Sequence, residues 1–371
     1  MNVRPHSAVV QAIVNPPIGP TGDVTLVDIG VSGGLADYWK AFGGSLKAIG
    51  FDPLVNAVKK LAASEQRPGV QYEAGYVGCR DFDALFPADQ RQVRVDPYPR
   101  VSAVRAHELV RMDFVADKQN EGEPLAWSER HLTLDEYFPR ATELDFLKVD
   151  TDGSDLQVLV GADRLLREGA FLGVLVEAQF QGWPHDYANT FANIDRWLRA
   201  RGFALYDIDH HRYTRAALPG LFARDLLAET RTGQLLWGDA LYFRDLAHPA
   251  YAATWHYAIT RRRLLTLAAF FDLFALPDCA AELVLSHPHL TSEAERSTLL
   301  DLLVTSAGFQ ARYTEHLHRF EADPESFFPP SLPANGDRGV RLQADQTPAA
   351  STPALRRWRR RLASLKRRLG M

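Results

Sequence analysis

Short apolar runs alternate with amphipathic helical stretches through the first two thirds of the chain. The predicted strands are Val24–Ile29, Ser45–Phe51, Val70–Glu73, Leu144–Val149, Leu172–Val176, Phe203–Ile208 and Ala240–Phe243. Helices are predicted over Leu54–Ala63, Ser154–Arg167 and Tyr187–Arg201. Strands that alternate with helices of this size require a mostly parallel sheet with helices on both faces. The pattern therefore predicts an open α/β domain whose ligand site lies at the carboxyl ends of the strands.

The remaining segments differ in pattern from this domain. Apolar residues recur at helical spacing through residues 250–320, and six prolines between 321 and 354 indicate an extended linker. An irregular insertion that we expect to form a substrate-side loop interrupts the α/β domain. The predicted organisation is an N-terminal extension (1–23), the α/β domain (24–247) with its insertion (79–130), a C-terminal helical annex (248–320), a Pro-rich linker (321–353) and a basic amphipathic tail helix (354–371).

The tail combines an apolar stripe with a strongly basic surround. Its apolar residues recur three and four positions apart, at Leu355, Trp358, Leu362, Leu365 and Leu369. Residues 351–371 hold eight Lys and Arg and no acid, so the other 350 residues carry a net charge of −12, where the whole chain has −4. A helix of this kind typically lies on an anionic membrane surface, and we expect residues 355–369 to bind such a surface. Two alternatives stay open, in which this helix packs within the chain or joins copies of the chain in a homo-oligomer.

Charge and cysteine content narrow the classes of protein. The acidic body argues against general nucleic-acid binding. Two cysteines, Cys79 and Cys279, are too few for a disulfide framework and fit no short metal-ligand spacing. There is no apolar stretch of signal-peptide length near the N-terminus and no run of eighteen apolar residues elsewhere. We therefore predict a cytoplasmic protein, held peripherally on the inner face of the membrane by its tail.

The loop after the first strand, Gly30-Val31-Ser32-Gly33, contains the small residues that allow a backbone to approach a ligand. Asp52 ends the next strand, where a carboxylate can accept both hydroxyl protons of a ribose. The loop lacks the full G-x-G-x-x-G pattern, and Asp28 would repel a pyrophosphate but suits the amino group of a methionine moiety. These features favour S-adenosylmethionine as the ligand and disfavour a nicotinamide-dependent dehydrogenase.

Further motifs follow in order between residues 24 and 245. They are VDIG (27–30), IGFDP (49–53), TLDEY (133–137), DFLKVDTDGSD (145–155), VL (158–159), GA (161–162), VE (176–177), GF (202–203) and GDALYF (238–243). In these motifs the chain resembles the FkbM family of class I S-adenosylmethionine-dependent methyltransferases. The resemblance implies a Rossmann-like fold and methyl transfer from S-adenosylmethionine, commonly to a hydroxyl of a sugar or polyketide. We expect the cofactor to be bound by Asp28, Gly30, Ser32, Gly33, Asp52 and Asp150.

Carboxylates at the ends of neighbouring strands are the candidate catalytic groups. Asp150 and Glu177 end the fourth and fifth predicted strands and should open onto one crevice. A hydroxyl that attacks a sulfonium methyl needs alignment and help in losing its proton. We expect Asp150 to receive that proton or to bind a cation that does, and Lys148 to hold Asp150 from the same strand face. Structural roles stay open, as an ion pair for Lys148 and as helix caps for Asp152 and Ser154.

Histidines offer a second kind of general base, because imidazole titrates near neutrality. His185 follows the fifth predicted strand, and His210 and His211 follow the sixth, although packing roles stay open for all three. Trp183 and Tyr187 could line a sugar site or plug the core.

A divalent cation is a further alternative. Asp150, Asp152, Glu177 and Asp239 could ligate Mg or Ca, but we do not favour a cation and predict no metal site.

The sequence therefore predicts an O-methyltransferase whose acceptor is a hydroxyl-bearing small molecule or glycan, most simply a sugar in a polysaccharide intermediate. An O-methyltransferase of a polyketide-type molecule stays open. So does a non-catalytic module that binds S-adenosylmethionine or another nucleoside.

Overall fold

A computed structural model describes residues 1–86, 126–139, 144–182, 184–213, 230–308 and 311–324. Most of the predicted linker, the tail, most of the insertion and Trp183 lie outside these residues. The main sheet contains β1 (Val24–Ile29), β2 (Leu46–Asp52), β3 (Val70–Ala74), β6 (Phe146–Val149), β7 (Gly173–Gln179), β8 (Phe203–Tyr213) and β9 (Gln234–Arg244). A separate two-stranded ribbon pairs β4 (Tyr76–Val77) with β5 (His131–Leu132).

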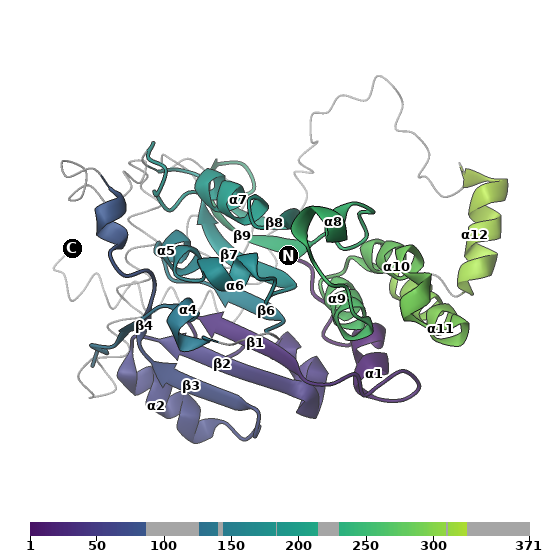
Figure 1. Cartoon of the computed structure of the whole chain (residues 1–371), viewed down its shortest axis with the longest axis horizontal. Coiled ribbons are helices and arrows are strands. Elements are labelled where there is room, and N and C mark those ends of the chain that lie inside the picture. The colour runs from purple at the N-terminus through teal and green to yellow at the C-terminus, as the bar shows by residue number, and fades with distance from the viewer. Residues whose placement is uncertain (87–125, 140–143, 183, 214–229, 309–310, 325–371) are drawn as a thin grey trace, which may run out of the picture.

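The strand order of the main sheet is β3-β2-β1-β6-β7-β9-β8 (Figure 1). The five strands from β3 to β7 are mutually parallel, and β9 runs antiparallel to both of its neighbours. The order reverses between β1 and β6, so the crevice at their carboxyl ends is the expected ligand site. The predicted mostly parallel α/β sheet is confirmed, with β8 and β9 longer than their apolar runs predicted.

Side-chain alternation along each strand divides the core between the two faces of the sheet. Val27, Leu147 and Val176 pack on one face, against α4 (Leu134–Tyr137), α5 (Asp155–Val160), α6 (Asp163–Arg167) and α7 (Phe191–Arg199). Leu26 and Phe146 pack on the other face, with the buried residues of α1 (Ala8–Val14), η1 (Asp37–Ser45) and α9 (Arg261–Leu273). Figure 1 shows α5, α6 and α7 in front of the sheet. Helices therefore cover both faces, as predicted.

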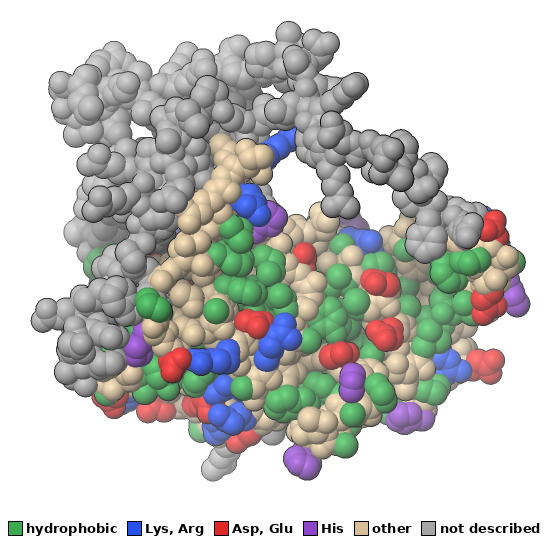
Figure 2. All heavy atoms as spheres, turned by 90° about the horizontal axis from the view of Figure 1, so that it is seen from above, with side chains coloured by type: hydrophobic (Ala, Val, Ile, Leu, Met, Phe, Trp, Pro, Cys, Tyr) green, Lys and Arg blue, Asp and Glu red, His purple; other side chains and the backbone are tan. Residues whose placement is uncertain are grey.

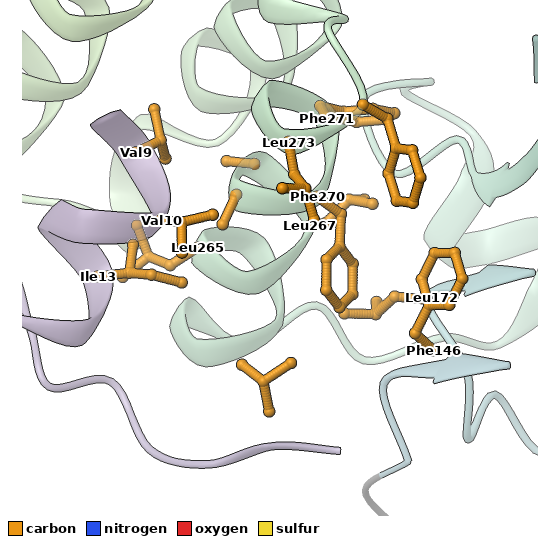
Figure 3. Close-up of a cluster of buried hydrophobic side chains, with 14 of the residues drawn as sticks. Val9, Val10, Ile13, Phe146, Leu172, Leu265, Leu267, Phe270, Phe271 and Leu273 are labelled. Atoms are coloured by element: carbon orange, nitrogen blue, oxygen red, sulfur yellow. The ribbon is translucent and has the colours of Figure 1, made fainter. Parts of the chain in front are cut away.

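Helix α9, from the predicted annex, packs directly on the sheet. Every residue from Leu264 to Leu273 is buried, and Figure 3 shows Phe270 of α9 next to Phe146 of β6. The charged residue within this run, Asp272, accepts hydrogen bonds from Ser7 Oγ (2.6 Å) and the Val9 amide (3.2 Å). Asp272 thereby fixes α1, a helix that the apolar pattern did not predict, against α9.

Further helices complete the described part of the chain. They are α2 (Val55–Ser64), α8 (Tyr251–Trp255), α10 (Pro277–Ser286), α11 (Glu293–Ser306) and α12 (Tyr313–Ala322), with short 3₁₀ turns η2 (Phe82–Leu85) and η3 (Pro288–Leu290). Among the described residues, no helix is long and apolar enough to cross a bilayer.

The single helix predicted over 154–167 is wrong, because the chain forms α5 and α6 with a break at Gly161. A Cβ atom at Gly161 would lie 1.9 Å from the carbonyl oxygen of Gly78. The break and the missing side chain allow the segment after β4 to pass close by.

Candidate functional site

The loop after β1 is drawn against the ends of two neighbouring strands by Gly30. This residue has a positive φ of 88°, and its amide donates a hydrogen bond to the carbonyl of Phe51 (2.9 Å). A Cβ atom at Gly30 would lie 1.7 Å from the carbonyl oxygen of Asp150, so only glycine fits. At Gly33, by contrast, a Cβ atom would meet nothing within 4 Å. The space beside Gly33 is therefore open to a ligand.

Asp52 closes the same corner from the end of β2. Its Oδ1 accepts the Leu54 amide at 2.8 Å, and its carboxylate also accepts the Ser32 amide. Burial raises the pKa of Asp52, against the effect of these hydrogen bonds. A carboxylate has about four acceptor positions, so Asp52 retains capacity for ligand hydroxyls.

One face of the sheet changes from apolar to charged along its strands. On β6, Phe146 lies in the core beside α9, and Lys148 and then Asp150 follow on the same face at intervals of two. On β1, Leu26 is followed in the same way by Asp28, which is the cross-strand partner of Lys148. The charged half of this face lies at the carboxyl ends of the strands, where the sheet topology places the ligand site.

Lys148 links the two aspartates of this cluster. Its Nζ lies 3.3 Å from Asp28 Oδ1 and 3.3 Å from Asp150 Oδ2. Burial raises the pKa of Asp28 to about 6, although Lys148 opposes the shift. Burial disfavours the charge of Lys148, but the two carboxylates outweigh it and raise the pKa of this amine. At neutral pH the cluster therefore contains a fixed Lys148 cation between Asp28 and Asp150.

Glu177 and Asp239 extend the cluster onto β7 and β9, where they are direct cross-strand partners. Burial and the carboxylates of Asp155 and Asp150 raise the pKa of Glu177 to about 9. Burial and the Asp150 carboxylate raise the pKa of Asp239 to about 6. Glu177 Oε2 is buried and has no hydrogen-bond partner among the described residues. Glu177 therefore carries a proton at neutral pH that it can donate to a ligand oxygen.

Asp155 holds the loop between β6 and α5. Its Oδ1 accepts the amide and the hydroxyl of Thr151 (both 2.9 Å), while Oδ2 accepts the Gly153 amide (3.3 Å) and Asn189 Nδ2 (3.0 Å). Ser154 occupies the N-cap position of α5, but its side chain makes no capping hydrogen bond. The capping alternative left open for Ser154 is therefore excluded, and Asp155 anchors the loop that begins at Asp150.

His185 is packed in a local turn. Its ring stacks on Phe86 with a centroid distance of 4.5 Å, and its Nδ1 accepts the Tyr187 amide at 3.1 Å. An imidazole that accepts at Nδ1 carries its proton on Nε2 when neutral, so it has no unoccupied basic nitrogen in this arrangement. The geometry consequently favours the carboxylate cluster over His185 as the source of a general base.

The structure brings Asp28, Lys148, Asp150 and Glu177 together. The sequence predicts that Lys148 shares a face with Asp150 and that Asp150 and Glu177 open onto one crevice, but not that Asp28 pairs with Lys148. The sequence indicates Asp239 only as a possible metal ligand, and it indicates Asp155 only as part of the DFLKVDTDGSD motif. Tyr38 lies near the cluster, because the charges of Lys148, Asp28 and Asp239 all act on its pKa, which burial raises. No sequence signal singled out Tyr38. In the described part of the chain, no group of three or more His, Cys, Asp or Glu has the geometry of a metal site.

Comparison with protein families gives one match. The model described as "Methyltransferase FkbM domain" matches residues 128–205, which include Lys148, Asp150, Asp155 and Glu177. The predicted resemblance is confirmed over this segment, and with the doubly wound sheet it confirms an S-adenosylmethionine-dependent, class I, Rossmann-like methyltransferase. No curated protein matches the chain.

Solved structures with similarity to this chain include several methyltransferases. A TehB-like S-adenosylmethionine-dependent methyltransferase from Corynebacterium glutamicum has 9% identity and a TM-score of 0.27, covering 66% of this chain and 89% of its own. Aeropyrum pernix fibrillarin, with natively bound S-adenosyl-L-methionine, has 12% identity and a TM-score of 0.30, covering 64% and 75%. A methyltransferase from Mesorhizobium loti has 13% identity and a TM-score of 0.28, covering 65% and 98%. Because these TM-scores are low, the solved structures carry no weight in the assignment as a methyltransferase. That assignment rests on the strand order and on the family match.

Proposed function

We propose that the protein transfers the methyl group of S-adenosylmethionine to a hydroxyl of a sugar, in a glycan or polysaccharide intermediate. The observation that carries this proposal is the Asp150 carboxylate at the end of β6. Its side chain is 48% exposed, whereas Lys148 is 18% exposed and Asp28 is 1% exposed. Asp150 is thus an accessible carboxylate on a fixed, charged support, which suits removal of a proton from an acceptor hydroxyl.

The corner between β1 and β2 fits the cofactor. Asp52 would accept ribose hydroxyls, while the open space at Gly33 and the tight turn at Gly30 leave backbone groups accessible. The bound cofactor supplies an electrophilic methyl group on a sulfonium. The backbone amide of Ser32 supports the corner by donating a hydrogen bond to the Asp52 carboxylate. Asp28 is buried against Lys148, so its proposed role is to fix that cation rather than to contact the cofactor.

Two carboxyl groups of the cluster, Asp150 and Glu177, are assigned to activation of the acceptor. Asp150 would take the proton of the attacking hydroxyl and release it to solvent, because its carboxylate is accessible. Lys148 would keep that carboxylate in place through its 3.3 Å contact. Protonated Glu177 would donate from Oε2 to an acceptor oxygen and thereby orient the sugar. Proton transfer of this kind contributes about 10²–10⁴-fold to a rate.

Titration calorimetry with S-adenosylmethionine and NAD tests the cofactor corner. We expect S-adenosylmethionine to bind, NAD not to bind, and Asp52→Ala to weaken S-adenosylmethionine binding at least tenfold. Asp37→Ala changes an exposed carboxylate on η1 that pairs with nearby Lys40; it is the matched control and should bind normally. Unchanged affinity in Asp52→Ala would contradict this assignment of the ribose contact.

We also propose that the basic tail, 355–369, binds an anionic membrane surface and brings the enzyme to a lipid-linked acceptor. Each cation near such a surface contributes about 1 kcal/mol. Removal of 351–371 should abolish sedimentation with vesicles that contain phosphatidylserine. Equal sedimentation of the shortened and full chains would remove the membrane proposal and leave sugar methylation untouched.

A further inference from the structure

Three aromatic rings form an exposed, nearly parallel column on the small β4–β5 ribbon. The Tyr76 ring lies between the other two, 5.0 Å from the His131 ring at 13° and 6.5 Å from the Trp127 ring at 17°. We call Trp127, Tyr76 and His131 the aromatic ladder. All three residues are exposed, with Trp127 54% and Tyr76 37% accessible.

Folding alone accounts for only part of the ladder. Tyr76 and His131 are direct cross-strand partners, and such a pair stabilises a short ribbon. Trp127 precedes β5 and leaves more than half of its large surface in water, which favours neither folding nor solubility. Exposed aromatic surface that is not required for packing is typical of binding sites. The ladder therefore calls for a ligand that stacks on flat rings.

The surroundings of the ladder are polar but electrically balanced. Arg130 Nη1 lies 2.6 Å from Glu73 Oε2, and Glu73 also accepts a hydrogen bond from the Tyr137 hydroxyl. Arg80 pairs in the same way with Glu136 (3.0 Å). Because these guanidinium groups are already neutralised by carboxylates, the surface does not suit a polyanion such as a nucleic acid. It does offer donors and acceptors to the hydroxyl groups of a neutral ligand.

The ladder is attached rigidly to the proposed cofactor corner. The Gly75 amide donates to the carbonyl of Asp52 (3.0 Å), and the Ser128 amide donates to the carbonyl of Pro53 (2.8 Å). The Val55 amide donates to the carbonyl of Ala126 (2.8 Å). These bonds tie both strands of the ribbon to the residues that follow β2, at the ligand-binding edge of the sheet.

We propose that the aromatic ladder is a glycan subsite that holds sugar rings of a neutral acceptor chain next to the proposed cofactor corner, at the ligand-binding edge of the sheet. A sugar ring offers apolar C–H faces to aromatic rings and hydroxyl groups to charged pairs at their edge, which is the chemistry that the ladder and Arg130–Glu73 provide. This inference rests on the proposed function and extends it from one sugar hydroxyl to an oligosaccharide or polysaccharide acceptor.

Affinity electrophoresis of the full chain tests the subsite, in native gels that contain dextran, hydroxyethylcellulose or galactomannan. We expect at least one polysaccharide to retard the protein, with binding weakened at least tenfold in Trp127→Ala and Tyr76→Ala. Trp127→Phe should retain binding. Phe320→Ala removes an equally exposed aromatic ring on α12 and should behave like the parent chain. Urea unfolding should give Trp127→Ala, Trp127→Phe and Phe320→Ala midpoints similar to that of the parent chain, and Tyr76→Ala, which also loses the cross-strand pair, a slightly lower one.

Three results would overturn the glycan subsite. One is a parent chain that none of the three polysaccharides retards, and another is retardation that persists in Trp127→Ala and Tyr76→Ala. The third is a Trp127→Ala variant that loses affinity for S-adenosylmethionine, because the ring would then belong to the cofactor site. The proposed function can fail separately. In that case no methyl group would be transferred to sugar, but the polysaccharide would still retard the protein in a way that depends on Trp127 and Tyr76.

Discussion

In the proposed mechanism, methyl transfer depends most directly on Asp150. Asp150→Asn keeps the shape of the side chain but removes its capacity to take a proton. We expect kcat for methyl transfer to sugar acceptors to fall about 10²–10⁴-fold, with S-adenosylmethionine affinity within about threefold of the parent value. Asp186→Asn alters an exposed aspartate paired with Arg196 and serves as control. A parental kcat in Asp150→Asn would exclude Asp150 as the base.

The raised pKa of Glu177 predicts how the free energy of unfolding depends on pH. Its pKa is about 9 in the folded protein and near 4.5 in the unfolded chain, so the folded state binds the extra proton between these values. The unfolding free energy should therefore fall as pH rises, by at most about 1.4 kcal/mol per pH unit from this group. Asp28, Asp155 and Asp239 have pKa values of about 6, so these three carboxylates lose most of their protons below the interval from pH 7 to 9 in which Glu177 titrates.

Urea unfolding of the parent and Glu177→Gln between pH 7 and 9 measures this dependence. Glutamine cannot titrate, so the variant should lose less stability over the interval. Parallel curves for the two proteins would show that Glu177 is not the protonated group.

Sequence pattern predicted part of the cluster, and the reason is local geometry. Alternation within one strand places Lys148 and Asp150 on the same face, whatever else the fold does. The contact of Glu177 with Asp239 depends on the antiparallel register of β9 with β7, which no local pattern encodes. The stacking of His185 on Phe86 likewise requires a tertiary contact.

At the scale of elements, the loop from β6 to α5 depends on Asp155. Asp155→Ala would leave the donors of Thr151, Gly153 and Asn189 without their acceptor, at a cost of about 1–3 kcal/mol for buried groups. We also expect methyl transfer to fall, because Asp150 opens this loop. Ser154→Ala removes a side chain with no capping bond and should change the unfolding free energy by less than about 0.5 kcal/mol. Equal effects of the two substitutions would contradict the anchoring role.

Helix α9 is tied to the sheet by a buried ion pair. Arg262 Nη1 and Nη2 lie 2.9 and 2.8 Å from the two oxygens of Asp145, which is fully buried and also accepts the Thr25 amide. Arg262→Met leaves this carboxylate uncompensated and should lower the unfolding free energy by about 3–5 kcal/mol. Arg167→Met breaks an exposed pair with Asp163 and should cost at most about 1 kcal/mol. Similar losses would show that the pair adds little.

Most strands followed from apolar runs, but element boundaries followed from contacts that the runs do not contain. The break between α5 and α6 is required by the approach of Gly78 to Gly161. Helix α1 is short and is fixed by Asp272, 265 residues away from Ser7. Long-range partners of this kind explain why α1 was not predicted.

For the whole molecule, the fold separates packing from chemistry along the same strands. Apolar side chains at the amino-terminal half of one sheet face join α1 and α9, and charged side chains at the carboxyl-terminal half form the cluster. On the face in Figure 2, acidic and basic side chains are interspersed among apolar ones. The acidic excess of the body therefore does not form one uniform field on that face, and the cluster acts through its local arrangement.

Transfer of labelled methyl groups from S-adenosylmethionine to glycans is the most direct test of the central claim. The parent enzyme should place label in sugar, as a methyl ether that survives mild alkali. The Asp150→Asn variant should incorporate about 10²–10⁴-fold less label in the same time. Label that mild alkali releases as methanol from a methyl ester, label found only in non-carbohydrate products, or equal labelling by Asp150→Asn would contradict the account.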